Sequence, residues 1–227
     1  MLNGFTDWHS HILPGVDDGI PDMEKSLAVL RSYEAKGVKR VWLTPHIMED
    51  YPNTPEDLQK KYAELCLEWD GNVELKLAAE NMLDSLFEER LENRDFLPIG
   101  DNGMYLLVET SYFSPPMNFD ELIDGIKSVG YFPVLAHPER YRYMQERDYK
   151  SLKERGVIFQ VNFMSLVGLY GETARKKAEW LLKQNMVELT GSDIHRLSAT
   201  ERYLQKSPTT RDTLDRILNV ASNPRLS

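Results

Sequence analysis

GFTDWHSH, at residues 4–11, combines a short β-type run with two histidines at its end. Six further runs of this kind follow, at residues 39–44, 73–79, 104–109, 132–136, 157–162 and 186–190. Most are continuous apolar segments bounded by Gly, Pro, Asn or Asp, which is typical of strands buried on both faces of a parallel sheet. The pattern therefore predicts seven strands.

Helical segments lie between these runs. The first begins at Asp22, a favourable N-cap, carries an apolar stripe and ends at Gly37. The second begins at Thr54-Pro55, which places a cap before a proline at the first helical position. Further helices are expected at residues 84–93, 120–128, 148–155, 172–184 and 211–221.

The alternation of strands and helices predicts an α/β protein with a parallel sheet. No internal repeat or linker is visible, so we expect residues 1–227 to form a single domain, a distorted TIM-like (β/α)7 barrel. An open, doubly wound sheet is the alternative, because spacing alone does not show closure. The C-terminal helix and tail, at about residues 207–227, carry no motif.

The composition excludes several classes of protein. The chain is 41% hydrophobic and 28% charged, so it can form a core, and its net charge of −9 opposes binding to nucleic-acid phosphates. One cysteine, Cys66, allows neither an intramolecular disulfide nor a cysteine-based zinc site. No secretory signal and no apolar stretch of ~20 residues is visible, so we expect a cytoplasmic protein that does not insert into membranes.

All five histidines lie at or just beyond the C-terminal end of a predicted strand. They are His9, His11, His46, His137 and His195. In barrels of parallel strands, functional side chains converge at this end. One such histidine would be interpreted as an ordinary hydrogen-bonded residue, but five at one rim indicate a metal site.

Carboxylates occur at matching positions, namely Asp18, Glu80, Glu109 and Asp193. Residues i and i+2 of an extended segment point the same way, so His9 and His11 can bind one ion together, as can Asp193 and His195. Alone, Asp17-Asp18-Gly19 would be a polar turn, and Glu80 a first-turn acid of the next helix. Together with imidazoles, they favour Mn²⁺, Zn²⁺ or Fe²⁺.

The combined motifs resemble those of a known family. The relevant segments are DWHSH at residues 7–11, VDDG at 16–19, TPH at 44–46, AHPERY at 136–141 and GSDIH at 191–195. Over about residues 5–195 they resemble the polymerase-and-histidinol-phosphatase (PHP) superfamily, and within it the CpsB/YwqE-type metal-dependent protein-tyrosine phosphatases of capsule and exopolysaccharide synthesis.

The resemblance implies a PHP barrel that holds three divalent ions, often manganese. The first ion would be bound by His9, His11, Glu80 and Asp193. The second would share Glu80 and also take Glu109 and His137, and the third would take Asp18, His46 and His195. The segment at residues 47–51 departs from some relatives, since it lacks their basic loop residues, and this bears on substrate preference.

The hypothesis for the reaction is attack of a metal-bridging hydroxide on phosphorus, with His137, Asp193 and Arg140 as catalytic residues. Arg140 would contact the phosphoryl oxygens, although an ion pair with Glu139 or Glu146 is its alternative role. Tyr141 is a candidate to hold the aryl ring of a substrate. Cys66 lacks a phosphate-binding loop and is expected to be a small core residue, so cysteine-based phosphatase chemistry is rejected.

Three classes of function stay open. The preferred one is hydrolysis of phosphotyrosine in a protein, with a bacterial tyrosine kinase as the expected partner. Another enzyme class is a small-molecule phosphatase of the histidinol-phosphate kind, or a PHP exonuclease, which the net charge disfavours. A non-catalytic, metal-stabilised adaptor that binds a kinase is the third.

Overall fold

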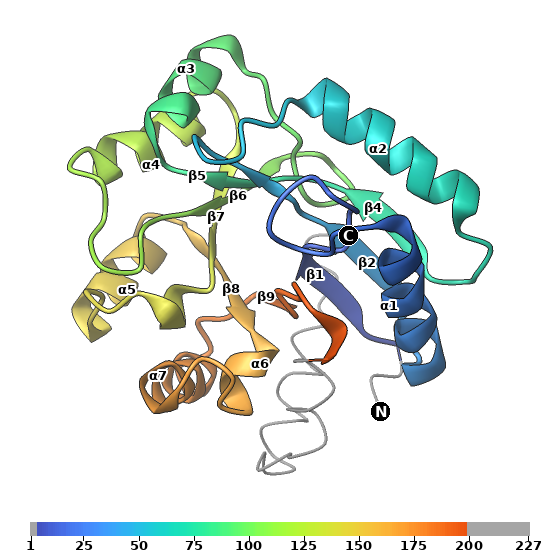
Figure 1. The fold of residues 1–227 in the computed structure, drawn as a ribbon. Helices are drawn as coiled ribbons and strands as arrows, with labels where there is room; N and C mark the ends of the chain where they lie inside the picture. The colour runs from blue at the N-terminus through green and yellow to red at the C-terminus, as the bar shows by residue number, and fades with distance from the viewer. Residues whose placement is uncertain (1–3, 199–227) are drawn as a thin grey trace.

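The computed structural model describes residues 4–198 and contains a curled sheet in which all neighbouring strands are parallel (Figure 1). Its strands are β1 (Thr6–Ser10), β2 (Arg40–Leu43), β3 (His46–Ile47), β4 (Glu74–Leu77), β5 (Glu80–Met82), β6 (Tyr105–Glu109), β7 (Phe132–Ala136), β8 (Ile158–Asn162) and β9 (Leu189–Gly191). The pairing follows chain order, β1-β2-β4 in one part and β3-β5-β6-β7-β8-β9 in the other. This confirms the predicted α/β fold with a parallel sheet.

Each of the seven predicted runs overlaps a strand, and two short strands that were not predicted, β3 and β5, follow the second and third runs, so nine strands are found among the described residues. Pro45 has no N–H to donate and separates β2 from β3. Ala78 and Ala79 separate β4 from β5 at the same level of the sheet. Backbone hydrogen bonds of 2.9 Å from the Ala78 amide to the Leu43 carbonyl and of 3.0 Å from the Glu80 amide to the Pro45 carbonyl hold these two connecting segments side by side. His46, expected after a strand, therefore lies within a short strand of its own.

The first and last strands of the sheet meet. The amides of Ser192 and Asp193 donate to the carbonyl of His9 at 3.1 and 2.8 Å, and that of His11 donates to Ile194 at 3.2 Å. Gln160 of β8 and the end of β9 therefore lie beside the histidines of β1. The sheet curls as the predicted distorted barrel requires, and the alternative of an open, doubly wound sheet is wrong.

Helices surround the outer face of the curled sheet (Figure 1). They are α1 (Met23–Lys36), α2 (Pro55–Glu68), α3 (Ser85–Asn93), α4 (Phe119–Ser128), α5 (Glu146–Glu154), α6 (Phe163–Leu166), α7 (Glu172–Lys183) and the 3₁₀ turn η1 (Pro138–Arg140). Asp22 and Thr54 cap α1 and α2 as predicted, and Gly37 ends α1 with a positive φ of 85°. The single-turn helix α6 was not predicted. The helix expected at residues 211–221 lies outside the described residues.

The exposed side of α2 carries the one cysteine. Cys66 is exposed there, whereas Leu58 and Leu65 of the same helix are fully buried. The expectation of a core cysteine is thus wrong. The buried face of α2 contains Leu65, and Cys66, the next residue, lies on the exposed face. Within residues 4–198, no helix is long and apolar enough to cross a membrane.

Side chains alternate between two apolar layers along the strands. On β6, Leu106 and Val108 belong to the large cluster shared with the helices, whereas Leu107 belongs to a smaller one. The smaller cluster consists of Trp8, Trp42, Ala78, Ile99, Leu107, Val134, Ala136 and Leu189. Glu109 is two residues beyond Leu107 and so points to the same face of the sheet. The small cluster is therefore an apolar floor inside the curl, below the charged residues at the strand ends.

Candidate metal centre

The structure brings all nine predicted ligands together at the C-terminal ends of the strands. His9 and Glu80 lie in β1 and β5, Glu109 ends β6, and the others lie in β3 or in the loops that follow strands. Nitrogen and carboxylate oxygen atoms of these residues form four groups within 4.8 Å. The groups are His11, Asp18, His46 and His195; His9, His11 and Asp193; His9, Glu80 and His137; and His46, Glu80 and Glu109.

Glu80 is at the middle of the cluster. Its Oε2 lies 3.0 Å from His9 Nε2 and 3.2 Å from His11 Nε2, and its Oε1 lies 2.9 Å from His137 Nε2. The Nε2 atoms of His9 and His11 are 3.1 Å apart. With His46, whose Nδ1 lies 3.2 Å from Oε2, four imidazoles converge on one buried carboxylate.

His46 lies between two of the groups. Its Nδ1 is 3.1 Å from Glu109 Oε1 and 3.2 Å from Glu80 Oε2, whereas its Nε2 is 3.6 Å from Asp18 Oδ1. His195 Nε2 lies 3.4 Å from the same Asp18 oxygen. The residues expected at the third ion are therefore adjacent, but His46 also faces the acids expected at the second ion.

The cluster has the properties of a cation site. His9, His11 and Glu80 are fully buried, and among the described side chains His46 Nδ1 and Glu109 Oε1 are buried without a hydrogen bond. Burial opposes protonation of His9 and His46, but the neighbouring carboxylates outweigh burial and raise their pKa values to about 9 and about 10. Buried charge of this density needs compensation, and nitrogen with carboxylate donors suits Mn²⁺, Fe²⁺ or Zn²⁺.

A second layer of polar groups orients the candidate ligands. Asp17 Oδ2 lies 2.8 Å from His11 Nδ1, and Gln160 Oε1 lies 2.7 Å from His9 Nδ1. Asn162 and Tyr170 donate to Asp193 Oδ2 at 2.8 and 3.1 Å. Such partners set the orientation of metal-binding imidazoles and carboxylates. Sequence reasoning missed Gln160, Asn162 and Tyr170, although the i, i+2 spacing of the first two at the end of the sixth run was a usable signal.

Arg140 belongs to the same site. It is the last residue of η1, the 3₁₀ turn that directly follows His137. Its Nη1 is 2.5 Å from Asp193 Oδ2. Its guanidinium lies between two aromatic rings, 4.4 Å from the centroid of Tyr112 and 4.1 Å from that of Tyr170. Burial opposes its charge, but Asp193 outweighs burial and raises the pKa of Arg140. Its ion pair is thus made inside the site, with Asp193, and not with Glu146 at the surface.

Tyr141, predicted to bind substrate, does not face the cavity. Its side chain is fully buried, its hydroxyl accepts a hydrogen bond from the Thr110 amide at 3.2 Å, and its ring packs against His137. The prediction fails because the 3₁₀ turn after β7 directs Arg140 into the site and the next side chain into the core. Tyr112 and Tyr170 are the tyrosines that line the cavity.

A cavity of about 460 Å³ opens above the cluster. Its walls are formed by Asp18, His46, Glu80, Tyr112, His137, Arg140, Leu169, Tyr170, Asp193, His195 and Arg196. Two of these residues, His137 and Asp193, have positive φ angles of 33° and 54°. Non-glycine residues adopt this conformation at a cost, and such strain is concentrated at functional sites.

Comparison with known proteins identifies the family of this chain. The model of the family described as capsular polysaccharide synthesis, CpsB/CapC, matches residues 5–217. The chain belongs to the CpsB/CapC family. This member is 28% identical to tyrosine-protein phosphatase YwqE of Bacillus subtilis, over 88% of this chain and 81% of that protein. It is 30% identical to tyrosine-protein phosphatase CpsB of Streptococcus pneumoniae, over 88% and 87% of the two chains.

A solved structure resembles this family member as well. It comes from a study of YwqE from Bacillus subtilis and CpsB from Streptococcus pneumoniae, described as unique metal-dependent tyrosine phosphatases. The TM-score is 0.78 at 26% identity, and the match covers 95% of this chain and 92% of the other. The resemblance expected from the sequence motifs is thereby confirmed, and with it the fold.

Proposed function

We propose that this protein is a metal-dependent protein-tyrosine phosphatase of capsular or exopolysaccharide synthesis. The observation that carries the proposal is the convergence of five histidines and four carboxylates beneath a cavity that also contains Arg140. Relatives that match over most of their length are named tyrosine-protein phosphatases. Neither the small-molecule phosphatase nor the adaptor has an observation in its favour.

The candidate ligands support more than one ion. We assign three divalent ions, manganese by preference, to His9, His11, Asp18, His46, Glu80, Glu109, His137, Asp193 and His195. Bound ions of this kind lower the pKa of a coordinated water and neutralise charge on phosphoryl oxygens. The assignment of several ions is supported by four groups of three or four donors, which share His9, His11, His46 and Glu80 and therefore lie next to one another.

Arg140 is placed to bind the phosphoryl group. One edge of its guanidinium is held by Asp193, and the stacked rings of Tyr112 and Tyr170 restrict its rotation. Arg140 lines the cavity, and a guanidinium has further N–H donors, which suit forked contacts to phosphoryl oxygens. A tyrosinate leaving group has a pKa of about 10, so its departure requires less help from an acid than that of an alkoxide.

The substrate is a tyrosine-phosphorylated protein, and a bacterial tyrosine kinase is the proposed partner. A cytoplasmic location is part of the same proposal. The description of the family supports the link to capsular polysaccharide synthesis.

The test is hydrolysis of a phosphotyrosyl peptide and of histidinol phosphate by metal-stripped protein, with Mn²⁺, Zn²⁺ or Fe²⁺ added back. We expect peptide turnover only with metal, and a fall in kcat/KM of about 10²- to 10³-fold in Arg140→Ala. Arg142→Ala is the matched control, because this nearby arginine lies over Phe113 and not in the metal-site cavity. Turnover of histidinol phosphate with an inert peptide would contradict the proposal, as would full activity of Arg140→Ala.

A further inference from the structure

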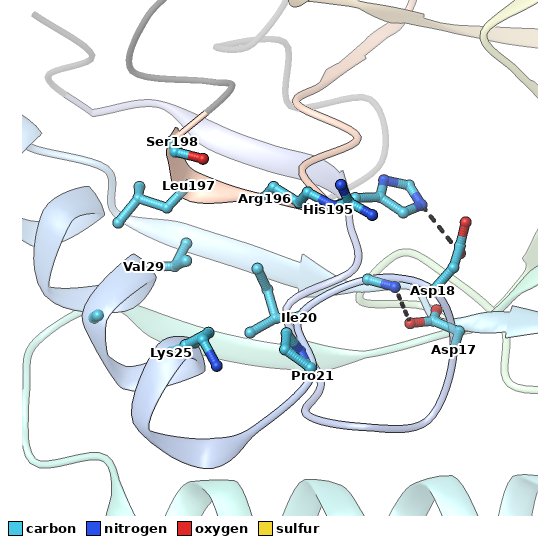
Figure 2. A pocket seen from close by; sticks show the side chains of 12 residues that line it. Asp17, Asp18, Ile20, Pro21, Lys25, Val29, His195, Arg196, Leu197 and Ser198 are labelled. Carbon is cyan, nitrogen blue, oxygen red and sulfur yellow. Dashed lines mark hydrogen bonds and ion pairs between the residues drawn. The ribbon is translucent and has the colours of Figure 1, made fainter.

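A second and larger cavity lies beside the metal centre, between α1 and the loops that follow β1 and β9. Its volume is about 770 Å³, within the range typical of ligand sites. Figure 2 shows the side chains of Ile20, Val29 and Leu197 around a common space, with the Asp18–His195 pair at one end. None of the functions assigned above uses this space.

The wall of this cavity is mainly apolar. Ile20 and Val29 are buried, Leu197 is half-buried, and Pro21 and Ala28 complete the lining between them. Lys25 is at the edge, where its ammonium group pairs with Asp22. The cavity therefore suits an uncharged, apolar group.

Hydrogen bonds hold the loop that forms one side of the cavity. The amide of Ile20 donates to the His11 carbonyl at 2.9 Å, and the amide of Gly15 donates to the Ile20 carbonyl at 2.8 Å. The Gly19 amide donates to Asp17 Oδ1 at 2.9 Å. The loop that carries the apolar wall is thus bonded to the segment that carries His11 and Asp17.

The two cavities share part of their lining. Asp18, His195 and Arg196 line both the metal-site cavity and the apolar one. A substrate held by its phosphoryl group above the metal centre can therefore extend over this common edge into the apolar cavity. A small phosphate ester would fill only the first.

We infer that the apolar cavity binds an aliphatic side chain adjacent to the phosphotyrosine of a protein substrate. The inference rests on the proposed phosphatase function and specifies its substrate class. The tyrosyl ring, being attached to the phosphoryl group, stays in the first cavity beside Tyr112, Leu169 and Tyr170. The second cavity is left for the neighbouring residue.

Two alanines on α1 provide a matched test. Ala28 and Ala35 are both exposed and lie two helical turns apart, but only Ala28 lines the cavity. Ala28→Trp would fill the cavity, whereas Ala35→Trp would add the same group elsewhere on α1. Leu197→Asp is a second variant, which places a charge on the opposite wall.

The measurement is kcat/KM for phosphotyrosyl peptides with Leu or Ser on either side of the phosphotyrosine, and for p-nitrophenyl phosphate. We expect the intact protein to favour one Leu peptide over its Ser counterpart by about tenfold or more. Ala28→Trp and Leu197→Asp should abolish that preference without changing p-nitrophenyl phosphate hydrolysis. Ala35→Trp should retain the preference.

The alternatives give different results. Equal turnover of Leu and Ser peptides, or a preference that survives in Ala28→Trp, would overturn the inference while metal-dependent turnover still supports the phosphatase. Absence of turnover of every phosphotyrosyl peptide and of p-nitrophenyl phosphate would instead contradict the proposed function. A change in oligomeric state in Ala28→Trp would assign the cavity to a second copy of this chain. Faster p-nitrophenyl phosphate hydrolysis in that variant would assign it to another segment of the same chain. Either result would also overturn the inference.

Discussion

The two carboxylate oxygens of Asp193 have different partners. Its Oδ1 lies 3.4 Å from both His11 Nε2 and His195 Nδ1, on the side of the candidate ligands. Its Oδ2 is bonded to Arg140, Asn162 and Tyr170. Burial favours the neutral acid, but the charges of His9 and Arg140 outweigh it and lower the pKa of Asp193. One oxygen is therefore fixed by the protein, and the other remains for a cation.

Gly191 is required by the close approach of β9 to β1. A Cβ at this position would lie 2.4 Å from His9 Cβ and 2.9 Å from Gln160 Nε2. Gly191→Ala should displace His9 and weaken metal binding about tenfold or more, measured by titration of the metal-stripped protein. Gly125→Ala is the control, since its Cβ meets only the flexible end of Leu91. Unchanged metal affinity in Gly191→Ala would contradict the role assigned to His9.

Substitution of Tyr141 and of Tyr170 by phenylalanine should have different effects, the first on stability and the second on catalysis. Tyr141→Phe removes a buried acceptor from the Thr110 amide, so it should lower the free energy of unfolding by about 1–3 kcal/mol and leave KM unchanged. Tyr170→Phe removes a hydrogen bond to Asp193, so it should reduce kcat/KM with little loss of stability. Thermal unfolding and peptide kinetics on both variants test this. A raised KM in Tyr141→Phe alone would restore Tyr141 as a substrate-binding residue.

Local sequence signals determine where the helices end, whereas pairing between strands determines which side chains lie next to each other. Asp22, Thr54 and Asp84 each accept a bond from a backbone N–H of the first helical turn, and these caps are visible in the sequence. The short strands β3 and β5 are different. They depend on pairing between segments about thirty-five residues apart, and the sequence pattern alone ended its runs before them.

The cap of α2 provides a test that is independent of the metal site. Thr54 Oγ1 accepts from the Asp57 amide at 3.2 Å and donates to the Asp57 carboxylate at 2.8 Å. Thr54→Ala should lower the free energy of unfolding by about 1 kcal/mol, which corresponds to a fall in Tm of about 2–4 °C, whereas Thr54→Ser should not. Peptide turnover per folded molecule should stay the same. A loss of turnover in Thr54→Ala would mean that α2 contributes to the site.

For the whole molecule, metal binding and stability are linked to pH. Without metal, His9 and His46 have pKa values of about 9 and about 10, above the usual 6.5, so they are charged at pH 7. Their contribution to stability is fully present below about pH 6.5 and is lost as the pH rises through 9 to 10. Bound metal requires the neutral imidazoles, so its affinity rises over the same interval.

We therefore expect chelation to lower Tm, and to lower it more at pH 8.5 than at pH 6.5. Calorimetry of metal-stripped and Mn²⁺-loaded protein at the two pH values measures this, with Tm compared at a fixed concentration of free metal. We also expect the protein to release protons when metal binds at pH 7, because the charged imidazoles must become neutral. An equal Tm difference at both pH values would contradict the assignment of these histidines as ligands.

Most of the helices and strands, the family and the residues that gather at the cluster followed from the sequence, although β3, β5 and α6 did not. Periodicity and caps depend on neighbouring residues only, and the rim of a parallel sheet collects whatever follows its strands, so His9 and Glu109 were predictable as partners of one site. The tertiary structure alone decided which atoms face each other. His46 lies between two groups, Tyr141 is in the core and Tyr170 is in the site, because these positions follow from strand register, the 3₁₀ turn and the closure of β9 on β1. Such contacts join residues distant in the chain, and no local pattern encodes them.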